Sequence, residues 1–355
     1  MLILAIETSC DETAVALVEN GTKIVSSVLS SSQDLHKKTG GVIPEQAARE
    51  QIKCMIPVLD EALKVAFSNR TLSETVSQID ALAVTYGPGL IGSLLIGIET
   101  AKTLSYLWQK PLIPVNHLIA HLYANWLENN KVNYIKPNTD VFPALCLVVS
   151  GGHTDLVLMK NHGQLSYLGG TRDDAAGEAF DKTARLLGLA GFMGGPAIAA
   201  AAEKYRQQSE KNLPKITLPR PMINSEDFDF SFSGLKTAVV NEVKKLQQTN
   251  DFNTQTINAL SYEIQEAITD VFEKKIFKAL NVFKPKAFLV AGGVSANLVL
   301  REKLKNVCAK TKVQFFVPPI RLCNDNAAYI GSYAFFNYHP APLLKISANP
   351  TLEII

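Results

Sequence analysis

The segment Leu-Ile-Leu-Ala-Ile-Glu-Thr-Ser-Cys-Asp-Glu occupies residues 2–12, and its pattern returns at residues 145–154 as Leu-Cys-Leu-Val-Val-Ser-Gly-Gly-His-Thr. Each is a short apolar run that ends in a polar turn, which is typical of a buried strand. Shifting the chain so that Thr8 falls on Ser150 also places Gly21 on Gly163, although few residues are identical. The sequence therefore predicts a duplicated domain.

Further strands follow each of these runs. Asn20-Gly21 separates the runs Ala14–Val18 and Lys23–Leu29, and Asn-Gly between two such runs is a strong hairpin signal. In the second half, Leu156–Met159 is followed by a turn at His162-Gly163. Both halves thus begin with a strand, a polar turn and a hairpin.

Each half also contains a later apolar strand that leads through a glycine turn into a helix. The first is Ala81–Thr85, with a helix that runs through Leu107. The second is Ala287–Ala291, with a helix from about residue 297 to residue 309. Strands that alternate with helices predict an α/β fold with partly parallel strands.

A length of 355 residues favours two domains over one core. The predicted N-terminal domain spans residues 1–140, and a C-terminal helix, about 326–355, is expected to pack back on it. The predicted C-terminal domain spans residues 141–325. Residues 203–232 are polar, irregular and contain prolines, so we expect an insertion there.

The composition is that of a well-packed globular protein, with 47% hydrophobic and 19% charged residues. The net charge of +2 excludes a strongly basic surface, so any RNA contact must come from local patches. Five scattered cysteines without CxxC spacing favour reduced thiols in a cytoplasmic protein. No apolar run approaches the roughly 18 residues of a spanning helix, so no membrane association is expected.

Two histidines, His117 and His121, are four residues apart in a helical pattern and therefore share a face. This spacing suits two imidazoles on one divalent cation, although two polar residues on a solvated face are an equally simple interpretation. A protease of the HExxH type needs a glutamate where Leu118 stands. Asp325 is the best candidate for a third ligand, and its alternative role is the N-cap of the following helix.

Glycine turns at Ser150-Gly151-Gly152, Gly194-Gly195 and Gly292-Gly293 indicate a nucleotide site. Glycine allows backbone N–H groups to approach phosphate oxygens, and a following helix N-terminus favours negative charge. The sequence contains no Walker motif and no GxGxxG after the first strand, which excludes the P-loop and Rossmann interpretations. Asp181 could accept hydrogen bonds from a ribose.

These segments together resemble a known family over essentially the whole chain. The matching blocks are residues 5–13, 40–45, 87–90, 117–121, 150–154, 173–183, 228–237, 292–297 and 325–326. The block Asp-Phe-Ser-Phe-Ser-Gly-Leu-Lys at residues 229–236 is nearly diagnostic. The family is that of the universal tRNA threonylcarbamoyl-adenosine transferases, once labelled O-sialoglycoprotein endopeptidases.

The resemblance implies an actin-like, sugar-kinase-like (ASKHA) fold with a nucleotide cleft between two duplicated lobes. It implies one divalent metal ion, iron(II) in preference to zinc(II), on His117, His121 and Asp325. It implies that threonylcarbamoyl-adenylate is bound by the following positions: Val148, Val149, Ser150, Gly151, Gly152, Asp181, Gly195 and Asn297. Asp11 or Glu12 is our candidate for the group that assists proton removal.

The implied reaction transfers the threonylcarbamoyl group to N6 of the adenosine 3′ of the anticodon, in tRNAs that read codons beginning with A, and releases AMP. The implied partners are tRNA, a paralogous actin-fold subunit and a small ATPase. A small-molecule kinase or ATPase of the same fold and a metal-dependent endopeptidase are the alternatives. Three residues depart from the family pattern, which has histidine at Gln51, often proline at Met193 and sometimes an acid at Ala199.

Overall fold

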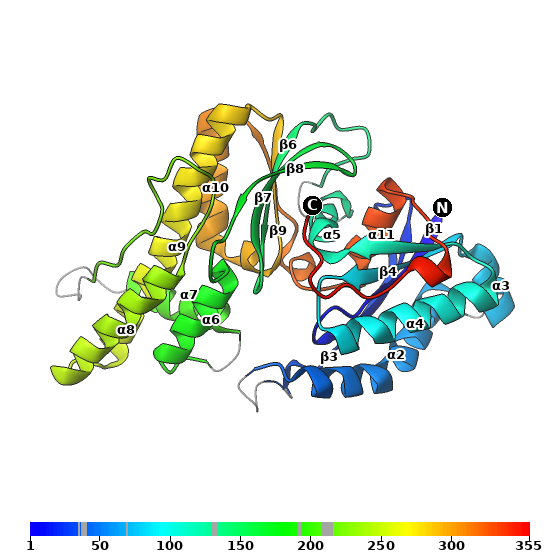
Figure 1. Ribbon diagram of the computed structural model, residues 1–355, viewed down its shortest axis with the longest axis horizontal. Helices are drawn as coiled ribbons and strands as arrows, with labels where there is room; N and C mark the ends of the chain where they lie inside the picture. Colours follow the sequence, from blue (N-terminus) through cyan, green and yellow to red (C-terminus); the bar gives the residue numbers. More distant parts are fainter. Residues whose placement is uncertain (35, 37–40, 69, 129–133, 191–192, 208–215) are drawn as a thin grey trace. The chain divides into compact units, whose positions relative to one another are not determined.

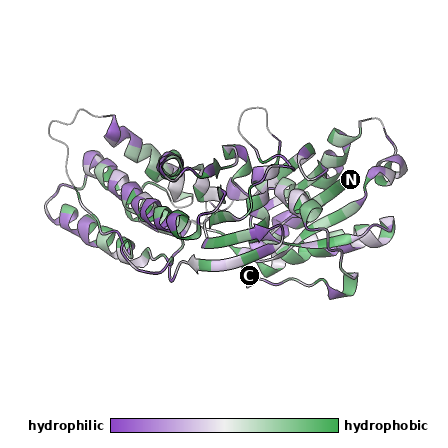
Figure 2. Ribbon diagram, turned by 90° about the horizontal axis from the view of Figure 1, so that it is seen from above, coloured by the Kyte–Doolittle hydropathy of each residue, from purple (hydrophilic) through white to green (hydrophobic). Residues whose placement is uncertain are grey.

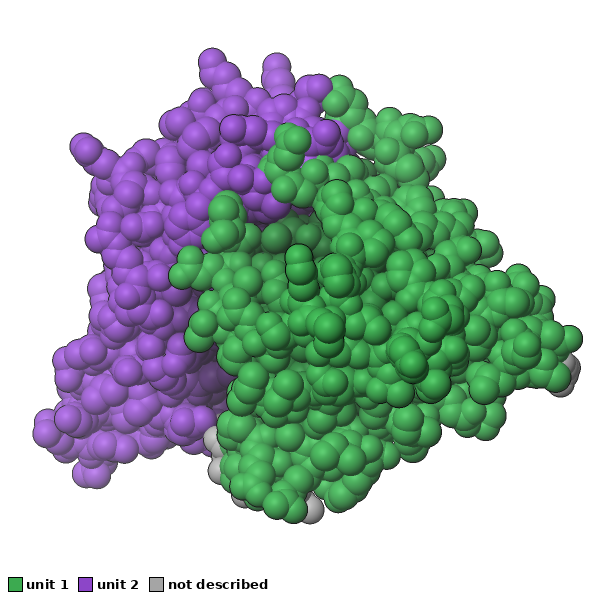
Figure 3. All heavy atoms as spheres, turned by 45° about the vertical axis from the view of Figure 1, so that its right-hand side comes forward, with its two compact units in different colours: residues 1–140, 162–164, 318–355 green, residues 141–161, 165–317 purple. Residues whose placement is uncertain are grey.

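The computed structural model describes residues 1–34, 36, 41–68, 70–128, 134–190, 193–207 and 216–355. The chain divides into two compact units, coloured separately in Figure 3. Unit 1 contains residues 1–140, 162–164 and 318–355, and unit 2 contains residues 141–161 and 165–317. Residues 318–325, which the sequence placed in the second domain, therefore pack within unit 1.

Unit 1 contains a mixed five-stranded sheet of order β3-β2-β1-β4-β5 (Figure 1). Its strands are β1 (Leu2–Glu7), β2 (Glu12–Glu19), β3 (Lys23–Ser31), β4 (Ala81–Gly87) and β5 (Leu112–Asn116). Strand β2 pairs antiparallel with both β1 and β3, whereas β4 pairs parallel with both β1 and β5. The predicted Asn20-Gly21 turn is confirmed, and both residues have positive φ.

Unit 2 repeats this topology in the order β8-β7-β6-β9-β10. Its strands are β6 (Ala144–Val149), β7 (Thr154–Asn161), β8 (Gln164–Gly170), β9 (Ala287–Ala291) and β10 (Gln314–Phe316). Strand β6 pairs antiparallel with β7 and parallel with β9, as β1 does with β2 and β4. The duplication predicted from the two opening segments is confirmed.

Helices cover both faces of the first sheet because its strands are apolar on both sides. One face packs against α2 (Pro44–Ala66) and α4 (Ile91–Trp108), and the other packs against α5 (His117–Tyr123) and α11 (Ala327–Phe336). The remaining helical elements of unit 1 are α3 (Leu72–Gln78) and the 3₁₀ turns η1 (Ala124–Trp126), η3 (Ile320–Leu322) and η4 (Leu343–Lys345).

Unit 2 is built around one apolar core. Its helices are α6 (Ala176–Leu186), α7 (Gly194–Arg206), α8 (Ser233–Gln248), α9 (Thr254–Phe283) and α10 (Leu298–Thr311), and η2 (Gly293–Ala296) precedes α10. The predicted insertion at 203–232 begins inside α7, and residues 208–215 of it lie outside the described part. From residue 216 to residue 229 it has no helix or strand.

Hydrophobic residues follow the strands, while the helices show both hydrophobic and hydrophilic residues (Figure 2). This is the expected pattern for helices that bury one face against a sheet. Within the described residues, no helix combines the length and the apolar character needed to cross a bilayer.

His162 lies in the β7–β8 turn and packs within unit 1. Its ring stacks on Phe336, with centroids 4.5 Å apart, and its Nδ1 lies 3.1 Å from the Tyr123 hydroxyl. Burial lowers the pKa of His162 to about 4. The folded state therefore favours the neutral ring, and protons bind more readily to the unfolded chain.

We expect acid to destabilise the protein through His162. Its contribution is complete above pH 6.5 and is lost as the pH falls from 6.5 towards 4. Because part of the ring is exposed, we expect a loss of about 1 kcal/mol between pH 7 and pH 5, below the full linkage value. Urea unfolding at both pH values should show a smaller loss for His162→Phe, which keeps the stack but does not titrate. Equal losses in both proteins would contradict this assignment.

Candidate metal centre and glycine turns

Helix α5 carries both histidines and begins directly where β5 ends. The Asn116 side chain caps it, accepting hydrogen bonds from the N–H groups of Leu118 and Ile119 at 2.9 and 3.3 Å. This cap sets the first turn of the helix. His117 and His121 then point the same way, with ring centroids 4.6 Å apart, and both are at least nine-tenths buried.

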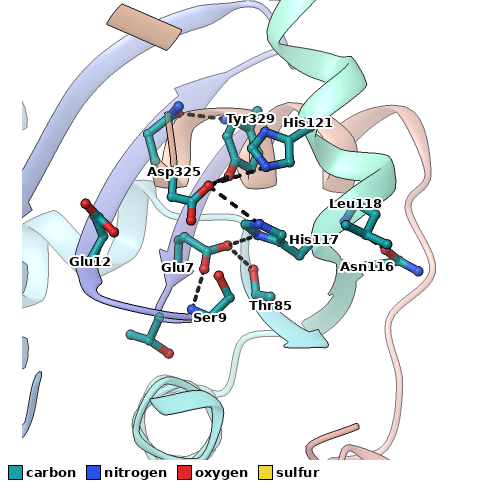
Figure 4. A network of polar contacts seen from close by, with 12 residues as sticks. Glu7, Ser9, Glu12, Thr85, Asn116, His117, Leu118, His121, Asp325 and Tyr329 are labelled. Carbon is teal, nitrogen blue, oxygen red and sulfur yellow. Dashed lines mark hydrogen bonds and ion pairs between the residues drawn. The ribbon is translucent and has the colours of Figure 1, made fainter. Parts of the chain in front are cut away.

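Asp325 immediately precedes the cap of α11. The cap is Asn326, whose Oδ1 accepts from the N–H groups of Ala328 and Tyr329. The alternative role of Asp325 as the N-cap is therefore wrong. Its carboxylate instead faces the histidines, with Oδ1 3.3 Å from Nε2 of His121 and 3.6 Å from Nε2 of His117 (Figure 4).

The structure thus brings together His117, His121 and Asp325, whose donor atoms lie within 4.8 Å of one another. All three belong to unit 1. Two imidazole nitrogens and one carboxylate oxygen suit iron(II) or zinc(II), leaving coordination positions for a substrate or water. Among the described residues, this is the one group of three such side chains that converges in this way.

Two further side chains at this centre were missed in the sequence. Glu7 lies 3.0 Å from Nδ1 of His117, and the Tyr329 hydroxyl donates to Asp325 at 3.3 Å (Figure 4). Both are fully buried. An acid at the end of an apolar strand was the available signal for Glu7, whereas Tyr329 had none.

The electrostatics of the centre favour a bound cation. Burial opposes charge on Asp325, but the adjacent His117 and His121 outweigh it and hold the pKa of Asp325 well below its usual range. Burial likewise disfavours charge on His117, but Glu7 and Asp325 overcome it and raise the pKa of His117 to about 9. Burial lowers the pKa of His121. Two carboxylates here therefore attract positive charge.

Asp11 lies on the turn after β1, and Glu12 is the first residue of β2. Burial and a hydrogen bond with Asp11, together with the charge of Asp325, raise the pKa of Glu12 to about 10. Asp11 and Glu12 share a hydrogen bond, and both stay candidates for the group that assists proton removal. Gln51 donates to the carbonyl oxygens of Cys10 and Glu12 at 3.0 and 2.9 Å, so this departure from the family pattern braces the turn.

In unit 2, two of the glycine turns follow the carboxyl ends of the neighbouring strands β6 and β9. Strands β6 and β9 are parallel with Val148 opposite Ala291, so Ser150 and Gly292 follow at the same edge. A Cβ on Gly292 would lie 2.4 Å from the Val149 carbonyl oxygen, and one on Gly177 would lie 2.5 Å from that of Ser150. Helix α6 therefore begins against the Ser150 turn, whose Gly151 and Gly152 are exposed.

The other expected adenylate-binding positions have roles within the fold. The Asp181 carboxylate accepts from the N–H of Gly194 at 2.5 Å at the start of α7, next to Gly195. Asn297 caps α10 and donates to Gln265 at 2.9 Å, while Val148 and Val149 are buried in β6. Met193 has φ +56°, which the proline expected at this position from the family resemblance could not adopt.

Comparison with known proteins agrees with this picture. A family model described as tRNA N6-adenosine threonylcarbamoyltransferase matches residues 23–332. Proteins of that name from Syntrophomonas wolfei and Thermomicrobium roseum are 45% and 46% identical, covering 98% and 95% of this chain and 96% and 92% of their own. A solved structure of HypF from T. kodakarensis is 13% identical, with a TM-score of 0.56 over 95% of this chain and 48% of that one. The predicted α/β actin-like fold class is confirmed.

Proposed function

The chain belongs to the tRNA N6-adenosine threonylcarbamoyltransferase family, and from this premise we propose that it transfers a threonylcarbamoyl group to N6 of a tRNA adenosine. The donor is threonylcarbamoyl-adenylate and the acceptor is the adenosine 3′ of the anticodon in tRNAs that read codons beginning with A. AMP is released. The observation that carries the proposal is the convergence of His117, His121 and Asp325 in a chain of this family.

His117, His121 and Asp325 would hold one divalent cation, iron(II) by family resemblance, with zinc(II) equally suited to the donors. A cation there supplies Lewis acidity that stabilises negative charge on a carbonyl oxygen. Asp325 and Glu7 balance its charge. Asp11 or Glu12 would take the proton that the attacking amine loses.

The turn of unit 2 would bind the adenylate. Gly151 and Gly152 are exposed, with no heavy atom of the described part of the chain within 4 Å of an added Cβ, and α6 begins beside them. Backbone N–H groups and a helix N-terminus favour a phosphate. Asp181 and the Gly195 backbone would hold the ribose, and Val148, Val149 and Asn297 would shape the walls around it.

The proposed partners follow from the reaction and from the family resemblance. They are tRNA, a paralogous actin-fold subunit and a small ATPase, and the proposed location is the cytoplasm.

The test is transfer of labelled threonylcarbamoyl from its adenylate to tRNA, with metal content measured on the same sample. We expect label in tRNA that carries the acceptor adenosine and none in tRNA with guanosine at that position. ATP turnover or phosphorylation of a small molecule without labelled tRNA would instead favour the kinase alternative. Peptide cleavage would favour the endopeptidase, which Leu118 already opposes.

A further inference from the structure

We propose that Glu7 is a positioning residue that orients His117 and sets the charge of the cation site. The inference rests on the proposed binding of a cation by His117, His121 and Asp325. Glu7 is not itself one of the proposed ligands. It contacts Nδ1 of His117 at 3.0 Å, whereas the nitrogen that faces Asp325 is Nε2.

The sheet determines where Glu7 points. It is the last residue of β1, and alternation along the strand places it on the same face as Ile3 and Ala5, which pack in the core under α11. Strand β4 runs parallel to β1, with Val84 opposite Ile6, so Thr85 lies beside Glu7. The carboxylate therefore enters the centre from the sheet, while the histidines enter from α5.

Three donors hold the Glu7 carboxylate in one orientation. Its Oε1 accepts from the N–H of Ser9 at 2.5 Å, and its Oε2 accepts from the Thr85 hydroxyl at 2.5 Å as well as from His117 (Figure 4). The side chain has no exposed surface. A carboxylate with these partners cannot rotate without leaving a buried donor unpaired, which is costly.

The consequence for His117 is a defined tautomer. Because Glu7 can only accept, Nδ1 carries a hydrogen, and Nε2, on the side of Asp325, is the nitrogen that is left to bind the cation. Carboxylates that anchor a liganding histidine in this way also raise its strength as a donor. Among the described residues, none is a hydrogen-bond partner of Nδ1 of His121, so Glu7 anchors one of the two rings.

The charge balance gives Glu7 a second effect. With a cation bound, both imidazoles act as neutral ligands, so the two negative charges of the centre are those of the fully buried Glu7 and of Asp325. A divalent cation brings the sum to zero, whereas a monovalent one leaves a buried negative charge, which is unfavourable. Glu7 thus favours a dication without touching it.

The experiment measures cation affinity with Co²⁺ and Zn²⁺ in competition with a chelator, using the full chain after removal of bound metal. We expect Glu7→Gln to weaken affinity about 10- to 100-fold and to alter the visible absorption of bound Co²⁺. Thr85→Val keeps the charge and loses one hydrogen bond, so its loss should be smaller. Glu19→Gln, at the exposed end of β2, is the matched control and should change nothing.

The outcomes separate this inference from the proposed function. If the wild type binds Co²⁺ while both Glu7→Gln and Thr85→Val keep its affinity and absorption spectrum, the positioning role is wrong, even where transfer is observed. A weakened Glu7→Gln in a protein that transfers no threonylcarbamoyl would leave the inference standing and end the proposed function. A wild type that binds no cation overturns the inference as well. If Glu7→Gln does not fold, the cation affinity and Co²⁺ spectrum of Thr85→Val decide whether Glu7 has the positioning role, and unchanged values would show that it does not.

Discussion

Replacing His121 with alanine is expected to remove the bound cation and abolish threonylcarbamoyl transfer. The Nε2 atom of His121 lies 3.3 Å from the Asp325 carboxylate, as expected for two ligands of one cation. Because His121 is 2% exposed, water does not readily take the place of its imidazole as a ligand. Loss of a direct ligand should exceed the roughly 10- to 100-fold loss of affinity that is typical of outer partners. We expect more than about a 100-fold loss, measured by metal content and by the transfer rate at saturating tRNA.

The control for this variant is His339→Ala, because His339 is exposed and lies outside the one group of potential metal ligands that the described residues form. It should keep both metal content and transfer rate. Circular dichroism would confirm that His121→Ala is folded. A folded His121→Ala protein with full metal content and full transfer would show that the cation is held elsewhere.

Gly177→Ala is expected to destabilise unit 2 and to disturb the turn at Ser150. An added Cβ would lie 2.5 Å from the Ser150 carbonyl oxygen and 2.7 Å from the Gly151 Cα, which are backbone atoms that cannot rotate away. Either α6 or the turn must move. Overpacking of this kind costs typically about 1–3 kcal/mol, which urea unfolding would measure. We also expect weaker adenylate binding, since the proposed phosphate contacts come from this turn.

Gly151→Ala is the matched control, because no atom of the described residues lies within 4 Å of its added Cβ. Its stability should stay within about 0.5 kcal/mol of the wild type. Its KM for threonylcarbamoyl-adenylate should rise, since the methyl group would occupy space proposed for the ligand. Equal stabilities of the two variants would contradict the close approach of α6 to the turn, and an unchanged KM for Gly151→Ala would place the adenylate elsewhere.

The strands and their duplication could be predicted because their signals are local. An apolar run of five or six residues that stops at a polar turn identifies β1 and β6 without any partner. Asn20-Gly21 specifies its turn by backbone conformation alone. The boundary near residue 325 was harder, because packing and not pattern assigns residues 318–325 to unit 1.

In the candidate site, too, one part could be predicted from the sequence and another could not. The spacing of His117 and His121 placed them on one face of a helix, and a single helix decides that geometry. Asp325 was ambiguous, because an aspartate before a helix caps as readily as it binds a cation. The competing cap, Asn326, is visible only once α11 has a defined first turn.

Taken alone, the amino-acid sequence determined the order of strands and helices, the repeat and the shared face of the two histidines, because each depends on neighbours a few residues away. The tertiary structure alone decided that Asp325 faces those histidines, that Glu7 and Tyr329 join them, and that Glu12 is buried beside a second carboxylate. The contacts of His117 with Glu7 and of both histidines with Asp325 join residues more than a hundred positions apart, and their energies depend on burial and on distances of a few ångströms. The parallel pairing of β1, β4 and β5 brings Glu7 and Thr85 to the end of the sheet where α5 begins. No local sequence pattern predicts this burial or these distances.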